Sequence, residues 1–278
     1  MTILSYFADS LYTSEAALRL ILTLFLNYPL AILYRKVFHF QSSFCQHLYF
    51  ITCGIGLVMF NYGLQVYHSL INVFIAYMLC RFLGGKLISV ILAYGIFMSY
   101  LLIGYHFMSL DGVYDMSWTM PQCILTLRLI GLVCDVYDGA QPADKRPPDQ
   151  QKTALTDPPT VLETLGYSYF FGGFLVGPQF PMKRYRGLVS GEYAEPDGGG
   201  PPASILAAMG RFVPGCLFLI AYQISITYHA TEHLLSDEWL LQPFLARIFL
   251  LLIWYRVMIF RSVPVAHNTA NSVCIELP

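Results

Sequence analysis

Long apolar windows separated by short polar stretches constrain this chain more than any other feature. A helix that crosses a membrane needs about 20 mostly apolar residues, within a range of roughly 17–25. Four windows have only weak polar interruption, and four others contain Gly, Pro or ionisable residues. The first group is 17–34, 65–83, 87–107 and 239–260, and the second is 46–62, 118–137, 161–180 and 204–228. The pattern predicts an all-α, multi-spanning bundle of transmembrane helices.

The composition agrees with a membrane protein and excludes several other classes. Hydrophobic residues make up 56% and charged residues 12% of the chain, whereas a soluble domain has about 25% charged residues. The net charge of −1 and the lack of zinc-ligand spacing give no indication of nucleic-acid binding or a metal site. The cysteines form no C-x-x-C pair, and we expect free, buried thiols at Cys45, Cys53, Cys80, Cys123, Cys134, Cys216 and Cys274.

The positions of Lys and Arg predict how the helices are oriented, because basic residues concentrate in cytoplasmic loops. They follow the first and third windows and occur in the 138–160 loop, but they are absent from 61–64 and 108–117. The residues concerned are Arg35, Lys36, Arg81, Lys86, Lys145, Arg146 and Lys152. This alternation predicts that 138–160 is cytoplasmic and that the N-terminus lies on the opposite side.

The window 161–180 is predicted to enter the membrane and return, as a re-entrant segment. If it crossed, the basic residues Lys183, Arg184 and Arg186 would lie on the non-cytoplasmic side. Its FGGFLVGP stretch also contains glycines and Pro178, which break a straight helix.

Arg128 lies in the middle of an apolar window. An ionisable residue at that depth is costly, so it should face the bundle or water and have a partner. Asp135 is seven residues further on, on the same helical face, and Asp138 follows three residues later. Two interpretations stay open. One is a polar lining for an anionic substrate group, and the other is a structural role, either as an ion pair or as a side chain that reaches the interface if the helix lies near it.

The histidines give no catalytic motif. His68 and His106 have no carboxylate nearby in sequence, so each is predicted to be a hydrogen-bonded helix residue rather than a general base. His229 and His233 are four residues apart, but Glu232 does not stand at the HExxH position, so a membrane-surface location is favoured over a metal site.

Five stretches, in order from about Ser14 to Arg261, resemble one family. They are SEAALRLILTLFLNYPLAILYR, FNYGLQVYHSL, YDMSWTMPQCILTLRLIGLVCDVYDG, SYFFGGFLVGPQFPM and, less closely, ARIFLLLIWYRVMIFR. The chain resembles the membrane-bound O-acyltransferases, specifically those that act on lysophospholipids. The resemblance implies that residues 1–261 are an N-terminal part of that transmembrane fold and that 262–278 form a divergent tail.

The resemblance also implies an activity in the endoplasmic reticulum membrane. Such enzymes transfer a fatty acyl group from acyl-CoA, a co-substrate, to the free hydroxyl of a lysophospholipid, without a cofactor. An intramembrane His would act as general base, and an Asn would help to hold the reacting groups. Acyl-CoA would enter from the cytoplasm and the lysophospholipid through the bilayer.

A limited set of site residues follows from the resemblance and from intramembrane polarity. Lys183, Arg184 and Arg186 are expected to meet the phosphates of acyl-CoA. The substrate-tunnel candidates are Trp118, Pro121, Arg128, Asp135, Asp138, Tyr169, Gly177, Pro178 and Gln179. For each residue taken singly, structural packing is an equally open interpretation.

No catalytic residue is assigned. The family's catalytic Asn and His belong to a C-terminal half that this chain is expected to lack, and its W-H-G motif does not occur here. His267 and Asn268 lie outside every resembling stretch. We therefore expect a lysophospholipid acyltransferase without its catalytic half. The alternative is a catalytically silent membrane protein that binds lipid or a partner, either a second copy or a full-length paralogue.

Overall fold

A computed structural model describes residues 3–10, 14–110, 117–142, 144, 146–175, 179–193, 210, 213–214 and 216–217. The chain divides into two compact units, residues 1–202 with 277–278 and residues 203–276. Almost all described residues belong to the first unit, and the fold below is that unit's. The window 239–260, the tail 262–278, most of 204–228, and His229 and His233 lie outside the described residues.

All regular elements among the described residues of this unit are helices, which confirms the predicted all-α class. Each predicted window before residue 140 corresponds to one long helix. The elements in order are α1 (Ile3–Ser10), α2 (Glu15–Leu33), a π-helical turn (Tyr34–Phe38), α3 (Ser43–Tyr62), a 3-10 turn (Gly63–Gln65), α4 (Val66–Leu83), α5 (Leu87–Leu110), α6 (Thr119–Ala140), α7 (Pro148–Thr153), α8 (Val161–Ser168) and α9 (Met182–Ser190).

Three segments are long and apolar enough to cross a membrane: Glu15–Phe38, Ser43–Leu83 and Leu87–Leu110. The middle segment contains both α3 and α4. The chain reverses between them at Gly63, whose φ of 59° is readily adopted by glycine. Together with α6, which is 22 residues long, these helices form a multi-pass bundle.

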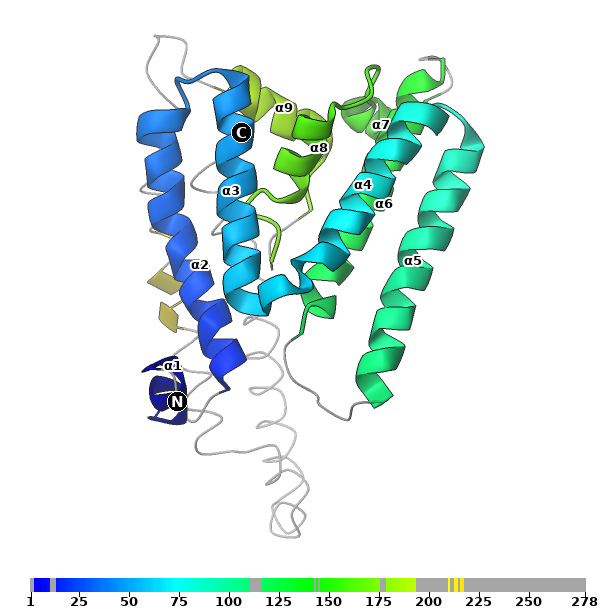
Figure 1. The fold of residues 1–278 in the computed structure, drawn as a ribbon. Helices are drawn as coiled ribbons and strands as arrows, with labels where there is room; N and C mark the ends of the chain where they lie inside the picture. The colour runs from blue at the N-terminus through cyan, green and yellow to red at the C-terminus, as the bar shows by residue number, and fades with distance from the viewer. Residues whose placement is uncertain are drawn as a thin grey trace, which may run out of the picture. The chain divides into compact units, whose positions relative to one another are not determined.

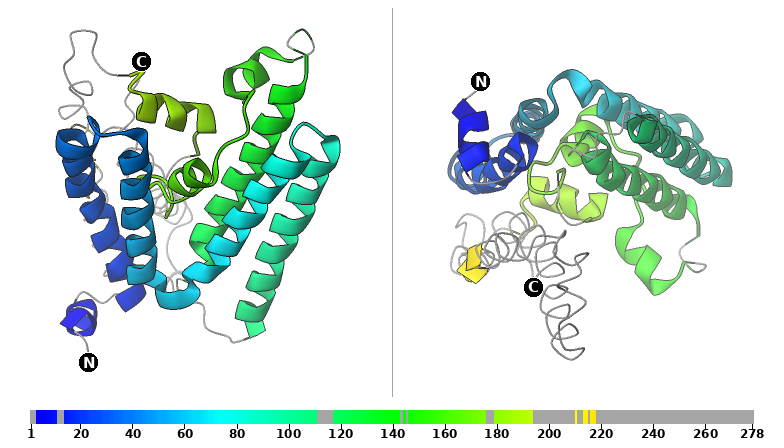
Figure 2. Two further views of the ribbon diagram at one scale, coloured as in Figure 1. Left: turned by 45° about the horizontal axis from the view of Figure 1, so that its top comes forward. Right: turned by 90° about the horizontal axis from the view of Figure 1, so that it is seen from below.

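The helices form two groups joined by the last two elements (Figure 1). The pair α2 and α3 makes one group, and α4, α5 and α6 make the other. Helix α6 packs against both α4 and α5, whereas α8 packs against α3 and α4. Figure 2 shows α8 and α9 lying between the two groups, so this short segment fills the space where the groups diverge.

The connections that follow α2, α4 and α6 lie at the same end of the bundle (Figure 1). Helix α9, which carries Lys183, Arg184 and Arg186, lies at that end too. The basic connections therefore lie at one end of the bundle, as the predicted alternation requires. It stays a prediction that this end faces the cytoplasm.

A buried aromatic cluster joins α8 and α9 to α3. Phe50 of α3 lies with its ring centroid 4.9 Å from that of Phe170 and 5.8 Å from that of Tyr185. One turn further along α3, a Cβ atom at Gly54 would overlap the carbonyl oxygen of Tyr169. The glycine thus lets α3 approach the turn that follows α8.

The segment 161–180 returns to the end of the bundle from which it starts. Helix α8 has eight residues, about 12 Å of helix, which is too short to cross a bilayer. On α9, the Arg186 side chain donates to both carboxylate oxygens of Glu163, in the first turn of α8, at 3.0 and 3.2 Å. This path matches the predicted re-entrant segment. Gly177 and Pro178 lie outside the described residues.

Candidate functional site: a cavity at the start of helix α6

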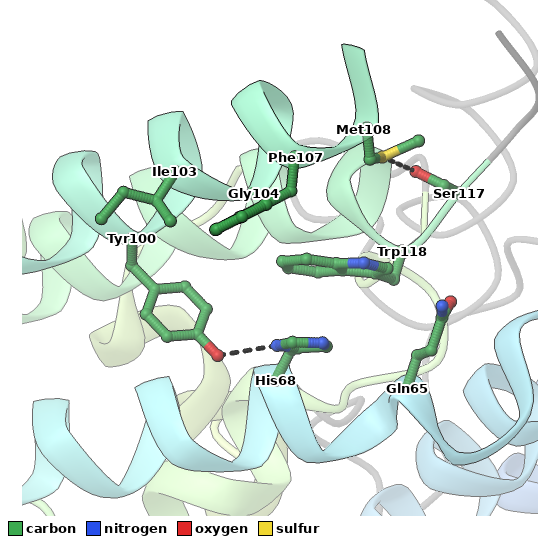
Figure 3. Close-up of a pocket in the computed structure, with 9 residues that line it drawn as sticks. All are labelled: Gln65, His68, Tyr100, Ile103, Gly104, Phe107, Met108, Ser117 and Trp118. Atoms are coloured by element: carbon green, nitrogen blue, oxygen red, sulfur yellow. Dashed lines mark hydrogen bonds between the residues drawn. The ribbon is translucent and has the colours of Figure 1, made fainter. Parts of the chain in front are cut away.

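A cavity of about 450 Å³ lies between α4, α5 and the start of α6 (Figure 3). Its volume falls within the roughly 300–1,000 Å³ typical of small-molecule sites. Apolar side chains of α5, including Phe107, form one wall. The polar groups on the lining are Gln65, His68, Tyr100 and Ser117. An apolar lining with a few polar groups suits an amphiphilic ligand.

His68 and Trp118 form the floor of this cavity. The His68 Nδ1 atom is 2.7 Å from the Tyr100 hydroxyl, and the imidazole stacks on the Trp118 indole at 3.8 Å between centroids and 6° between planes (Figure 3). Gly104 of α5 makes room for the indole, since a Cβ there would lie 2.8 Å from Trp118 Cη2. His68 is hydrogen-bonded as predicted. The ring of His106 is exposed and lies beside Phe107, and a hydrogen bond of His106 stays a prediction.

A much smaller recess of about 10 Å³ adjoins the cavity, and Gln65 and Trp118 line both. Pro121, Gln122 and Ser69 also line the recess. The Ser69 hydroxyl is in turn 2.6 Å from the hydroxyl of Tyr169. Three predicted tunnel residues (Trp118, Pro121 and Tyr169) therefore lie on or next to these two hollows.

Arg128 is buried, with 2% of its surface exposed, and it contacts the chain that follows α8. Its Nη2 donates to the Gly173 carbonyl at 2.7 Å, and its Nη1 donates to the Tyr167 carbonyl at 3.3 Å. Its Nε donates to Gln179 Oε1 at 3.3 Å, and the guanidinium lies 4.8 Å from the ring centroid of Phe180. Carbonyl dipoles and an aromatic face thus stabilise this charge inside the protein.

Gln179, another tunnel candidate, completes this junction. Its Nε2 donates to the Ile124 carbonyl on α6 at 2.6 Å, while its Oε1 accepts from Arg128. Arg128 and Gln179 together fix the turn after α8 against α6. Their described contacts are structural, and a direct role in holding substrate stays a prediction.

Asp135 and Asp138 lie near the far end of α6. Asp135 is 17 residues after Trp118, about 25 Å along the helix axis, so the two aspartates and the cavity are not brought together. The main-chain carbonyl of Asp135 accepts from the Leu155 amide at 2.9 Å, and this contact fixes the loop after α7 to α6. Leu155 is buried there, although most described residues between 141 and 160 are exposed.

The three basic residues of α9 are not equivalent. Arg186 is held by the Glu163 carboxylate and also donates to the Asp157 carbonyl at 3.1 Å. Lys183 is exposed and Arg184 is half-buried, and neither has an ion pair among the described residues. A phosphate could therefore reach Lys183 and Arg184 without breaking an existing pair.

Glu163 also caps α8. Its side chain accepts from the Thr160 amide at 2.8 Å, while the Thr160 hydroxyl accepts from the Glu163 amide at 3.3 Å, which is a capping box. Partial burial alone raises the pKa of Glu163, but hydrogen bonds from Thr160 and Arg186 outweigh it and leave the pKa below its ordinary value.

Sequence reasoning missed several polar residues of the site: Gln65, Ser69, Tyr100, Ser117 and Gln122. Each lies within or at the edge of an apolar window. An amide inside a membrane helix is costly unless it is hydrogen-bonded. That signal could have selected Gln122, whereas the part played by Tyr100 depends on a contact across 32 residues of sequence.

The comparison with known proteins agrees with a multi-pass helical membrane fold. The family model of the membrane-bound O-acyltransferases matches residues 107–273. The described fold and site are those of a multi-pass membrane protein, and the chain belongs to the membrane-bound O-acyltransferase family.

Several curated relatives are similar over most of the chain. Human Lysophospholipid acyltransferase 5 is 38% identical over 272 residues, which cover 98% of this chain and 55% of that protein. The Drosophila melanogaster protein of the same name is 41% identical over 94% of this chain and 52% of its own length. The Caenorhabditis elegans protein is 39% identical over 89% and 52%, respectively. The chain thus spans about half the length of these relatives.

Proposed function

We propose that this chain forms the lipid-handling half of a lysophospholipid acyltransferase. The observation that carries the proposal is the identity of 38–41% to proteins named Lysophospholipid acyltransferase 5 over nearly the whole chain. The reaction would transfer an acyl group from acyl-CoA to the free hydroxyl of a lysophospholipid. The comparisons do not favour the alternative of a silent binding protein.

The described contacts support the binding of a different substrate at each end of the bundle. The cavity at Trp118 would hold the lipid, because it is mostly apolar with a few hydrogen-bonding groups. Lys183 and Arg184 would bind the phosphates of acyl-CoA at the opposite end of α6, by charge-assisted hydrogen bonds. Arg128 and Gln179 would keep the turn after α8 in place between them.

Activity in microsomes tests this proposal. This chain would be expressed alone and, separately, in place of the matching N-terminal region of human Lysophospholipid acyltransferase 5. Labelled acyl-CoA and lysophosphatidylcholine would be supplied to both. We expect labelled phosphatidylcholine from the chimera, above an empty-vector control. A well-expressed, membrane-inserted chimera without activity would contradict the proposal, and product from the chain alone would show that it needs no further half.

Matched variants test the role proposed for the basic end of the bundle. Lys183→Gln with Arg184→Gln should raise the KM for acyl-CoA in the chimera, with less change for the lysophospholipid. Glu192→Gln, which alters an exposed charge just after α9, serves as the control. Residence in the endoplasmic reticulum and assembly with a second copy or a full-length paralogue are further parts of the proposal, to be tested by fractionation and cross-linking in cells.

A further inference from the structure

Gln122 presents an unsatisfied amide to the small recess behind Trp118. Only 2% of its surface is exposed, and within the part of the chain that the structure describes neither its Oε1 nor its Nε2 has a hydrogen-bond partner. Leaving buried polar atoms unpaired is unfavourable, and more so where bilayer rather than water surrounds the protein. A buried amide without partners at such a position points to a ligand that completes its hydrogen bonds.

The volume of the recess limits what that ligand can be. About 10 Å³ accommodates a single oxygen atom, close to the lower limit for one water molecule. A phosphate or a quaternary ammonium group is too large, and none of the described residues that line the recess is charged. A hydroxyl fits best, because it can donate to Oε1 or accept from Nε2, whichever atom faces it.

The neighbouring cavity supplies the rest of the site. Trp118 and Gln65 line both hollows, so a group bound in one lies against the group bound in the other. The cavity is mainly apolar and large enough for a hydrocarbon chain. We propose that the two hollows bind a single-chain membrane amphiphile, with its chain in the cavity and one uncharged hydroxyl at Gln122.

This inference rests on the proposed function, because it concerns the cavity proposed to hold the lipid, but the binding it describes needs no acyl-CoA and is tested without acyl transfer. The same chemistry, a hydroxyl close to a hydrocarbon chain, occurs in a long-chain alcohol and at the glycerol of a lysophospholipid. A brominated alcohol, a brominated lysophosphatidylcholine and a brominated alkane of equal chain length distinguish these sources. The alkane lacks the hydroxyl, and the alcohol lacks the phosphate.

The test uses quenching of Trp118 fluorescence by bromine in the full chain, reconstituted in nanodiscs. Trp239→Phe and Trp254→Phe leave Trp118 as the only tryptophan of the three. We expect the alcohol to quench at a concentration about threefold to tenfold lower than the alkane, the value of one neutral hydrogen bond. Gln122→Leu should remove that difference, whereas Gln150→Leu, on an exposed position of α7, should keep it. Quenching by the lysophospholipid at the alcohol's concentration would identify a lysophospholipid as the source.

Two results would overturn the inference. Equal quenching by alcohol and alkane would mean that Gln122 holds an internal water only, and so would an unchanged difference in the Gln122→Leu variant. If the single-tryptophan variant does not fold, a diazirine-bearing alcohol can be cross-linked to the unmodified chain and mapped by mass spectrometry. Labels confined to peptides distant from Gln65, Trp118 and Gln122 would then contradict it.

Discussion

The Arg186 guanidinium lies 3.0 Å from the Glu163 carboxylate and closes the hairpin formed by α8 and α9. The two residues are 23 positions apart, and an aromatic cluster beneath them joins the same hairpin to α3. This ion pair joins the two ends of a segment that starts and finishes at the same end of the bundle (Figure 1), and helix α8 within it is too short to cross a bilayer.

Glu163→Gln should lower the thermal stability of the purified chain in detergent. The substitution keeps the side-chain shape but removes the charge that pairs with Arg186. We expect a loss of about 0.5–1 kcal/mol, typical of a partly exposed pair. Circular dichroism during heating measures it, and Glu192→Gln, on an exposed carboxylate, is the control. An equal melting temperature for both variants would show that the pair contributes nothing.

The same carboxylate predicts a pH dependence. The folded-state pKa of Glu163 lies below its ordinary value of 4.5. Its stabilising contribution should therefore be complete above about pH 4.5 and decline as the pH falls through the lower folded-state pKa. Melting temperatures measured from pH 6 downward should decrease less steeply in Glu163→Gln than in the unmodified chain. Parallel curves would contradict this assignment.

Two glycines of α3 offer a matched comparison. A Cβ at Gly54 would overlap the Tyr169 carbonyl, whereas a Cβ at Gly56 would have no neighbour within 4 Å. Gly54→Ala should destabilise the chain by about 1–3 kcal/mol through overpacking. Gly56→Ala should be neutral or stabilise it by up to about 1 kcal/mol through higher helix propensity. Chemical or thermal unfolding measures the stability of both variants. A Gly56→Ala variant less stable than the Gly54→Ala variant would contradict the close packing of α3 against the turn after α8.

Arg128→Lys should be poorly tolerated. A lysine cannot form the fork of hydrogen bonds that reaches both Gly173 and Tyr167. Hydrogen bonds to charged groups are worth about 1.5–3 kcal/mol, so we expect a loss of at least about 2 kcal/mol. Arg81→Lys, on an exposed position near the end of α4, is the control. Size-exclusion profiles and melting temperatures report the effect. Similar values for both variants would show that the hydrogen bonds of Arg128 do not stabilise the fold.

His68 and Tyr100 should be energetically coupled. His68→Phe keeps an aromatic ring on Trp118 but removes the hydrogen bond to Tyr100, and Tyr100→Phe removes it from the other side. In a double-mutant cycle we expect a coupling free energy of about 0.5–1.5 kcal/mol. Tyr94→Phe, at an exposed position of α5, should show no coupling with His68→Phe. Additive effects of the first pair would mean that this hydrogen bond does not form.

Much of the fold could be predicted from the sequence, because long apolar windows determine where membrane helices form. Helix α5 occupies Leu87–Leu110, close to its predicted window 87–107. The re-entrant path followed from two further local signals, the glycine and proline residues of 161–180 and the basic residues after it.

The partners of the polar residues could not be predicted in the same way. Arg128 binds main-chain carbonyls of Tyr167 and Gly173, and every residue has such a carbonyl, so no side-chain pattern identifies them. Helical periodicity places Arg128 and Asp135 on the same face, and it leaves a structural pair between them as only one of the open interpretations. Similarly, the stacking of His68 on Trp118 joins residues 50 positions apart and depends on how α4 and α6 pack.

The contacts of Arg128 have a consequence for biosynthesis. Its carbonyl partners are encoded 39 and 45 residues later, so they leave the ribosome well after α6 does. Until then a bare guanidinium would have to remain in water or at the lipid headgroups. Helix α6 should therefore settle into its final depth only once the hairpin has emerged, which makes the two elements a single unit of membrane insertion.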